Sequence, residues 1–105
     1  MIAVIYRFCI RPAQFNRYQR YWVSMVDFLR NERGAVGSVL HRLGNEQLVI
    51  YSNWPDRVTY ERSWPDDDKI EDELPKEIAA MALNMRDCIV GEVDVQVLDV
   101  VCRKL

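Results

Sequence analysis

His41 is the only histidine in this 105-residue chain, so it is the side chain best suited to accept a proton near neutral pH. On a strand it would share a face with Val39 and Leu43, which indicates an apolar environment. Two interpretations stay open: a general base for a bound molecule, or a core or interface histidine satisfied by one hydrogen bond. A metal role is not expected, because no Cys or carboxylate lies at ligand spacing from it.

A second group of candidate residues lies close together in the sequence: Asn53, Trp54, Tyr60 and Trp64. Tyr60 and Trp64 are one helical turn apart and would share a helix face. Asn53 and Trp54 are neighbours on a strand and therefore project to opposite sides of it. Aromatic rings with a few polar groups are typical of a pocket for a flat ligand, although the same rings could simply fill the core.

Arg7 interrupts an otherwise apolar side of the first predicted strand. A guanidinium in that position could bind an anionic group of a ligand, or it could form an ion pair at an interface. Arg7 is therefore a candidate substrate-binding residue together with Trp54 and Trp64, whereas His41, Tyr60 and Asn53 are the candidate catalytic residues.

The elements that would position these residues follow the order β-α-β-β-α-β. Strands are predicted from runs of β-branched and aromatic residues, and helices from apolar residues spaced three and four apart. A Gly44-Asn45 pair predicts a tight hairpin turn, and Gly34 predicts a helix end. The predicted strands are 2–10, 36–43, 47–54 and 90–102, and the predicted helices are 13–33, 55–63 and one that begins at Pro75.

Two further features are expected along the chain. Six of the nine residues from Pro65 to Glu73 are acidic, which predicts a solvated connector. In the last strand the alternation of apolar and polar residues changes phase at Val97 and Leu98, which predicts either a bulge or a change of neighbouring element there.

This element order predicts a single domain over residues 1–105 of the α+β class: a ferredoxin-like, four-stranded antiparallel sheet with its helices on one face. The first and third strands are apolar on both faces, yet helices can cover only one of them. A second copy stacked on the other face would bury the remainder, so a homodimer is expected.

Composition excludes several classes of partner. The formal net charge is −2, and the predicted third strand carries no Lys or Arg, so nucleic-acid binding is not expected. The longest uncharged run is nine residues, Gln47 to Pro55, well short of the about 20 that cross a bilayer. Three Cys with no CxxC spacing are typical of reduced thiols, so a cytoplasmic location is expected.

The chain resembles the antibiotic biosynthesis monooxygenase family of small dimeric α+β barrel proteins. The resemblance is carried by the opening strand followed by Arg11-Pro12, by the segment 34–42 (GAVGSVLHR) and by the segment 49–55 (VIYSNWP). It implies a dimer whose sheets pack face to face, with a pocket between sheet and helices in each subunit. Several members of the family oxidise polycyclic phenols with molecular oxygen and no cofactor.

The resemblance also bears on individual residues. Trp54 and Tyr60 correspond to a Trp and a Tyr of the family's catalytic set, whereas Ile50 stands where that set has an Asn. The haem-degrading branch uses a histidine on its second helical region, and this chain has none after His41. No cofactor and no metal are therefore expected.

Two functional hypotheses result. In the first, the protein is a cofactor-independent monooxygenase that oxidises a planar phenolic or hydroquinone-like small molecule with O2. His41 or Tyr60 would serve as the base, Tyr60 or Asn53 would hold the phenolate, and Trp54 and Trp64 would form a stacking wall. In the second, the protein is a non-catalytic small-molecule binding or dimeric structural module of the same fold.

Overall fold

The computed structural model describes residues 1–104. The strands are β1 (Ile2–Ile10), β2 (Gly37–Leu43), β3 (Gln47–Trp54) and β4 (Ile89–Asp99). The helices are α1 (Phe15–Glu32), α2 (Arg57–Arg62), α3 (Ile70–Glu73) and α4 (Lys76–Cys88), with short 3-10 turns η1 (Pro12–Gln14) and η2 (Asp67–Lys69).

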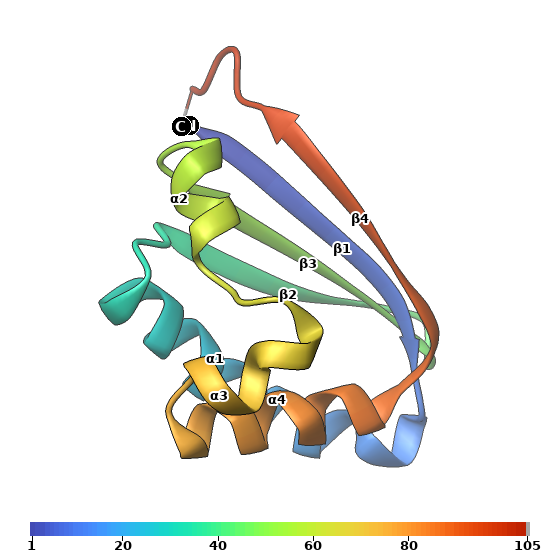
Figure 1. The fold of residues 1–105 in the computed structure, drawn as a ribbon. Helices are drawn as coiled ribbons and strands as arrows, with labels where there is room; N and C mark the ends of the chain where they lie inside the picture. The colour runs from blue at the N-terminus through green and yellow to red at the C-terminus, as the bar shows by residue number, and fades with distance from the viewer. Residues whose placement is uncertain (105) are drawn as a thin grey trace.

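The four strands form one antiparallel sheet in the order β2-β3-β1-β4. All of the helices lie on one side of this sheet, and its other side is bare in the single chain (Figure 1). The predicted α+β class and the ferredoxin-like arrangement are thereby confirmed.

The long helix α1 forms because its apolar residues recur at the helical period, and it turns that stripe toward the sheet. Tyr18 and Met25 are buried there, each about one turn from half-buried Trp22. After the helix, Gly34 adopts a φ of +84°, a left-handed conformation that lets the chain reverse into β2. Among residues 1–104, no helix is long and apolar enough to cross a membrane.

The hairpin between β2 and β3 is confirmed, with three residues between the paired Leu43 and Gln47. Gly44 alone of these turn residues takes a positive φ, +66°, so Asn45 does not use the left-handed conformation that it tolerates.

The acidic connector differs from the prediction, because it is folded rather than merely solvated. It contains η2 and α3, and Ile70 within it and Leu74 directly after it are 1% and 6% exposed. They pack with Met25 of α1 and with Ile78 of α4. The carboxylates do face water, but the apolar residues between them attach the connector to the helical layer.

The bulge also lies elsewhere than predicted. Val97 and Leu98 pair regularly with Val4 and Ala3, so the sheet is undisturbed at the change of phase. The register shifts instead near Gly91, which has a φ of +78° and lies opposite the segment of β1 between Arg7 and Cys9. A glycine adopts that backbone conformation without strain, whereas a valine does not.

Candidate functional site

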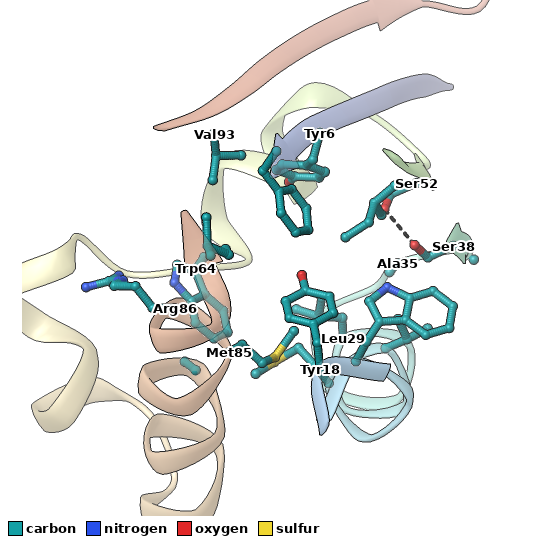
Figure 2. Close-up of a pocket in the computed structure, with 18 of the residues that line it drawn as sticks. Tyr6, Tyr18, Leu29, Ala35, Ser38, Ser52, Trp64, Met85, Arg86 and Val93 are labelled. Atoms are coloured by element: carbon teal, nitrogen blue, oxygen red, sulfur yellow. Dashed lines mark hydrogen bonds between the residues drawn. The ribbon is translucent and has the colours of Figure 1, made fainter. Parts of the chain in front are cut away.

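A cavity of about 430 Å³ lies between the sheet and the helices, within the range usual for small-molecule sites. Its walls come from β1, β2, β3, β4, α1, α4 and the connector after α2, so distant parts of the sequence meet around it (Figure 2). Most of the lining is apolar or aromatic. The lining residues are Tyr6, Phe8, Tyr18, Trp22, Met25, Val26, Leu29, Ala35, Gly37, Ser38, Ile50, Ser52, Trp54, Trp64, Ala82, Met85, Arg86, Ile89, Gly91 and Val93.

Trp54, the last residue of β3, presents the most unusual polar group of the cavity. The residue is only 3% exposed, and its indole Nε1 is buried with no hydrogen-bond partner in the described chain. A buried N–H without a partner is costly and rare in folded proteins. An acceptor atom on a ligand would satisfy this group only after a neighbouring side chain moved, because the nitrogen itself is closed off from the cavity.

Two tyrosines beside Trp54 are linked to each other by a hydrogen bond. The hydroxyl of Tyr6 on β1 donates a hydrogen bond to the hydroxyl of Tyr60 on α2 over 3.2 Å. The ring of Tyr60 packs against that of Trp54 at a centroid distance of 5.6 Å and a tilt of 60°. Tyr6 lines the cavity, whereas Tyr60 is not among the lining residues and adjoins it through these two contacts.

Burial keeps the tyrosines of the cavity protonated. Desolvation raises the pKa of the Tyr6 hydroxyl well above its ordinary value, and the hydrogen bond to Tyr60 adds to the shift. Burial likewise raises the pKa of Tyr18, whose hydroxyl points into the cavity (Figure 2). Both residues therefore serve as neutral donors or acceptors at physiological pH.

The remaining polar groups lie on the β2–β3 side and at the mouth. Ser38 and Ser52 project from paired positions, and their hydroxyl oxygens are 2.9 Å apart. Arg86 is the one charged residue of the described lining, and its guanidinium pairs with the Asp67 carboxylate at 3.1 Å. The side chains of this pair are 53% and 83% exposed, so the ion pair lies in solvent at the rim.

The structure brings some of the predicted site residues together and separates the others. Trp54 and Trp64 line the cavity, and Tyr60 adjoins it. Asn53 projects to the opposite side of the sheet from Trp54, where its amide donates to the Tyr51 hydroxyl over 3.4 Å.

Arg7 and His41 also lie on that opposite, uncovered side. Arg7 is exposed and donates to Gln96 on β4 over 2.8 Å. His41 is exposed on β2, and its Nδ1 donates to the Val49 carbonyl over 3.1 Å. It borders a second, smaller hollow between α1 and the edge of β2. The sheet thus separates His41, Asn53 and Arg7 from the main cavity of the same chain.

Sequence reasoning missed several residues that line the cavity. Tyr6 is the one residue with a polar group among the helix-facing apolar residues of β1, and this feature could have identified it as a candidate cavity residue. Tyr18 and Trp22 lie on the apolar stripe of α1, where a ring that lines a cavity has the same spacing as one that fills a core. Ser38 and Ser52 become a pair only through strand register.

No metal site is evident in the described part of the chain, since no three His, Cys, Asp or Glu side chains are grouped so that they could hold an ion.

Comparison with known proteins identifies the fold. No family model matches the sequence, and no curated protein does either. Among solved structures, Rv0793 from Mycobacterium tuberculosis superposes with a TM-score of 0.70 at 19% identity, covering 97% of this chain and 96% of that one. An antibiotic biosynthesis monooxygenase superposes with a TM-score of 0.72 at 16% identity, covering 97% and 100%. SnoaB, a cofactor-independent oxygenase from Streptomyces nogalater, gives 0.69 at 15% identity, covering 99% and 94%.

Proposed function

We propose that this chain, which has the fold of the antibiotic biosynthesis monooxygenases, is itself a monooxygenase that oxidises a planar phenolic or hydroquinone-like molecule with O2. The observation that carries the proposal is the aromatic cavity of about 430 Å³ between the sheet and the helices. A flat ligand would pack between its rings, and a small movement of the wall would let one ligand oxygen accept a hydrogen bond from the unpaired Nε1 of Trp54.

The reaction balances without an added reductant. A phenol with a hydrogen on the carbon opposite its hydroxyl, or a hydroquinone with a hydrogen on a carbon beside one of its hydroxyls, would lose that ring hydrogen and one hydroxyl hydrogen to one oxygen atom of O2, which leaves as water. The other oxygen atom becomes bonded to that ring carbon, which gives a quinone from the phenol and a hydroxyquinone from the hydroquinone. The substrate supplies the electrons, so the role of the chain is to bind, orient and desolvate it.

Four side chains have defined roles in this proposal. The Trp54 N–H holds a substrate oxygen and stabilises negative charge that develops there. Trp64 and Trp22 form flat walls that hold the ring system. Tyr60 acts indirectly, through its contacts with Tyr6 and Trp54.

A second candidate function is small-molecule binding without catalysis. One observation favours it: none of the described lining residues is a histidine or a carboxylate, so the cavity lacks the usual proton acceptors. The two functions share a binding site and differ in whether oxygen is consumed.

The experiment that separates them combines anaerobic binding with oxygen uptake. We expect anthrols, naphthols or hydroquinones to quench the tryptophan fluorescence without oxygen and to consume one O2 per molecule when air is admitted. Trp54→Phe should lower kcat/KM by about tenfold, the effect of losing one hydrogen bond to the transition state. Tyr21→Phe, outside the cavity on α1, serves as the control with unchanged rate.

Binding without oxygen uptake would instead favour the non-catalytic function. A protein that neither binds these compounds nor consumes oxygen would contradict both.

We also propose that the protein is a homodimer joined through the uncovered side of the sheet. Val39 and Leu43 are 51% and 61% exposed there, and Tyr51 and Leu98 are also exposed on that side. Exposed apolar residues on a sheet face that no helix covers favour association with a second copy.

A further inference from the structure

A groove lies beside the main cavity, between α1 and β2. It is the smaller hollow that His41 borders, and its volume is about 300 Å³. Trp22 and Ser38 border both the groove and the main cavity. A ligand in the cavity can therefore extend past these two side chains into the groove without crossing the sheet.

Two rows of side chains form the sides of the groove, one on α1 and one on β2. Their members are Phe15, Gln19 and Trp22 on the helix and Ser38, Leu40 and Arg42 on the strand. The helical residues are spaced by four and three positions and share one face, and the strand residues alternate and share the side toward the helices. From the rise per residue of a helix and of a strand, each row is about 10–13 Å long.

Arg42 lies at the end of the groove that is far from the cavity. Its guanidinium lies over the Phe15 ring, 4.4 Å from the centroid, and its Nε donates to the Gly44 carbonyl over 3.2 Å. These two contacts hold the guanidinium in place, and the hydrogen bond uses only Nε. Among residues 1–104 the one ion pair joins Arg86 to Asp67, so Arg42 has no carboxylate partner there.

The position of Arg42 sets it apart from the other arginines that lie over aromatic rings. Arg33 lies over Phe28 at 5.3 Å and Arg17 over Tyr21 at 5.8 Å, and neither arginine borders the cavity or the groove. The described lining of the groove contains no Asp or Glu, although the chain has a formal net charge of −2. The groove thus leads from an apolar cavity to a positive charge, which favours an anion attached to an apolar molecule.

We propose that this groove binds the anionic end of the ligand: the ring system lies in the main cavity, an aliphatic side chain passes over Leu40, and its terminal carboxylate pairs with Arg42. A carboxylate matches the fork of N–H groups on a guanidinium. The inference rests on the proposed function of the cavity and narrows its substrate class to planar phenols or hydroquinones with a side chain that ends in a carboxylate. A carboxylate bonded directly to the ring would not reach Arg42, whose guanidinium is held over Phe15, two helical turns from Trp22.

The test measures dissociation constants by anaerobic fluorescence titration with 1-naphthol, 1-naphthoic acid and 6-(1-naphthyl)hexanoic acid, and with the primary amide of each acid. The long acid should bind about fivefold more tightly than its amide, the ratio expected for one solvent-accessible ion pair. The short acid should bind no more tightly than its amide, because its charge would stay in the apolar cavity.

Arg42→Gln should bring the dissociation constants of the long acid and its amide close together and leave that of the amide unchanged. Arg33→Gln is the matched control: it removes a ring-stacked arginine and one positive charge outside both spaces, so the ratio should persist. Gln19→Trp, at an exposed position midway along the groove, should obstruct the groove. It should weaken both long probes and leave 1-naphthol unchanged. Each variant is checked for a wild-type circular dichroism spectrum and melting temperature.

Equal binding of the long acid and its amide to wild-type protein would overturn the proposal, and binding of 1-naphthol in the same experiment would leave the proposed function of the cavity intact. An unchanged ratio in Arg42→Gln would also overturn it. If Arg42→Gln does not fold, Gln19→Trp decides, since unchanged affinity for both long probes would place their side chains outside the groove. Failure of every probe to bind would contradict the cavity and the groove together. Preference for the long acid without oxygen uptake from any phenol would refute the monooxygenase and leave the role of Arg42 standing.

Discussion

At the scale of single residues, the cavity uses neutral polar groups on aromatic side chains. Tyr6 and Tyr18 keep their protons because burial raises their pKa values, and Trp54 can only donate. Arg86, the charged member of the described lining, is paired with Asp67 in solvent. Such a site recognises a ligand by the direction of its hydrogen bonds more than by its charge.

The raised pKa values predict how stability depends on alkaline pH. Tyr18 retains its proton when folded and loses it above its ordinary pKa of 10.0 when unfolded. Its contribution to stability is therefore complete below about pH 10 and is lost as the pH rises further. Urea unfolding of wild-type protein between about pH 8 and pH 11 should show this fall, and Tyr18→Phe should show a shallower one. Parallel curves for the two proteins would contradict this prediction.

The sequence predicts some site residues better than others, for a physical reason. Alternation along β3 correctly separates Asn53 from Trp54, because the period of a strand is two. For His41, the same alternation predicts that it shares a side of β2 with Val39. It does not predict whether the helices cover that side, since Leu40 on the other side is also apolar. The Tyr6–Tyr60 pair joins residues 54 positions apart, and only the tertiary fold brings them into contact.

At the scale of elements, the connector between α2 and α4 carries one wall of the cavity. Trp64 lines the cavity from this segment, and Ile70 and Leu74 bury it against the helical layer. The acidic residues around them dominate the composition and led to the prediction of a solvated connector. The segment folds against the helices because burying Ile70 and Leu74 is favourable, and the acidic side chains beside them remain in water while this happens.

Ile70→Ala should destabilise the protein by about 2–5 kcal/mol, because it leaves a cavity where a fully buried side chain was. Asp67→Asn, three residues away, should cost about 1 kcal/mol or less, since it removes only an exposed ion pair. Chemical denaturation measures both changes. Ligand affinity should also fall in Ile70→Ala through displacement of Trp64. Similar costs for the two variants would mean that the connector is not attached through Ile70.

Periodic elements were predicted closely, and local irregularities were not. The predicted and observed bounds of β1 and β3 coincide, because Pro12 follows β1 closely and because Gly44-Asn45 and Pro55 lie on either side of β3. The bulge was placed at the visible change of phase in β4, whereas the sheet places it at Gly91. A change in polarity reflects which side chains meet water, and it need not coincide with a backbone irregularity.

At the scale of the whole molecule, the sheet separates the ligand cavity from the surface proposed for self-association. The cavity and all helices lie on one side, and the proposed self-association surface lies on the other (Figure 1). Arg7, His41 and Asn53, which were expected at the ligand site, lie on this second side. Under the proposed dimer they would meet the partner subunit.

Val39→Lys should convert the proposed dimer into a monomer, because it places a charge within the apolar face. Val23→Lys is the matched control: Val23 on α1 is 49% exposed, almost the same as the 51% of Val39, but it lies on the helical side. Light scattering after size exclusion reports the mass. A wild-type monomer, or a Val39→Lys variant with unchanged mass, would contradict the proposed dimer.

The alternation along β1 has a consequence for how this protein can change. Tyr6 projects toward the cavity, while its neighbour Arg7 projects to the opposite side. Even positions of β1 therefore face the cavity and odd positions face the uncovered side of the sheet, although they are adjacent in the sequence. A combinatorial library restricted to the even positions of β1 would explore new ligands while conserving the surface on which two subunits would meet, and one restricted to the odd positions would do the reverse.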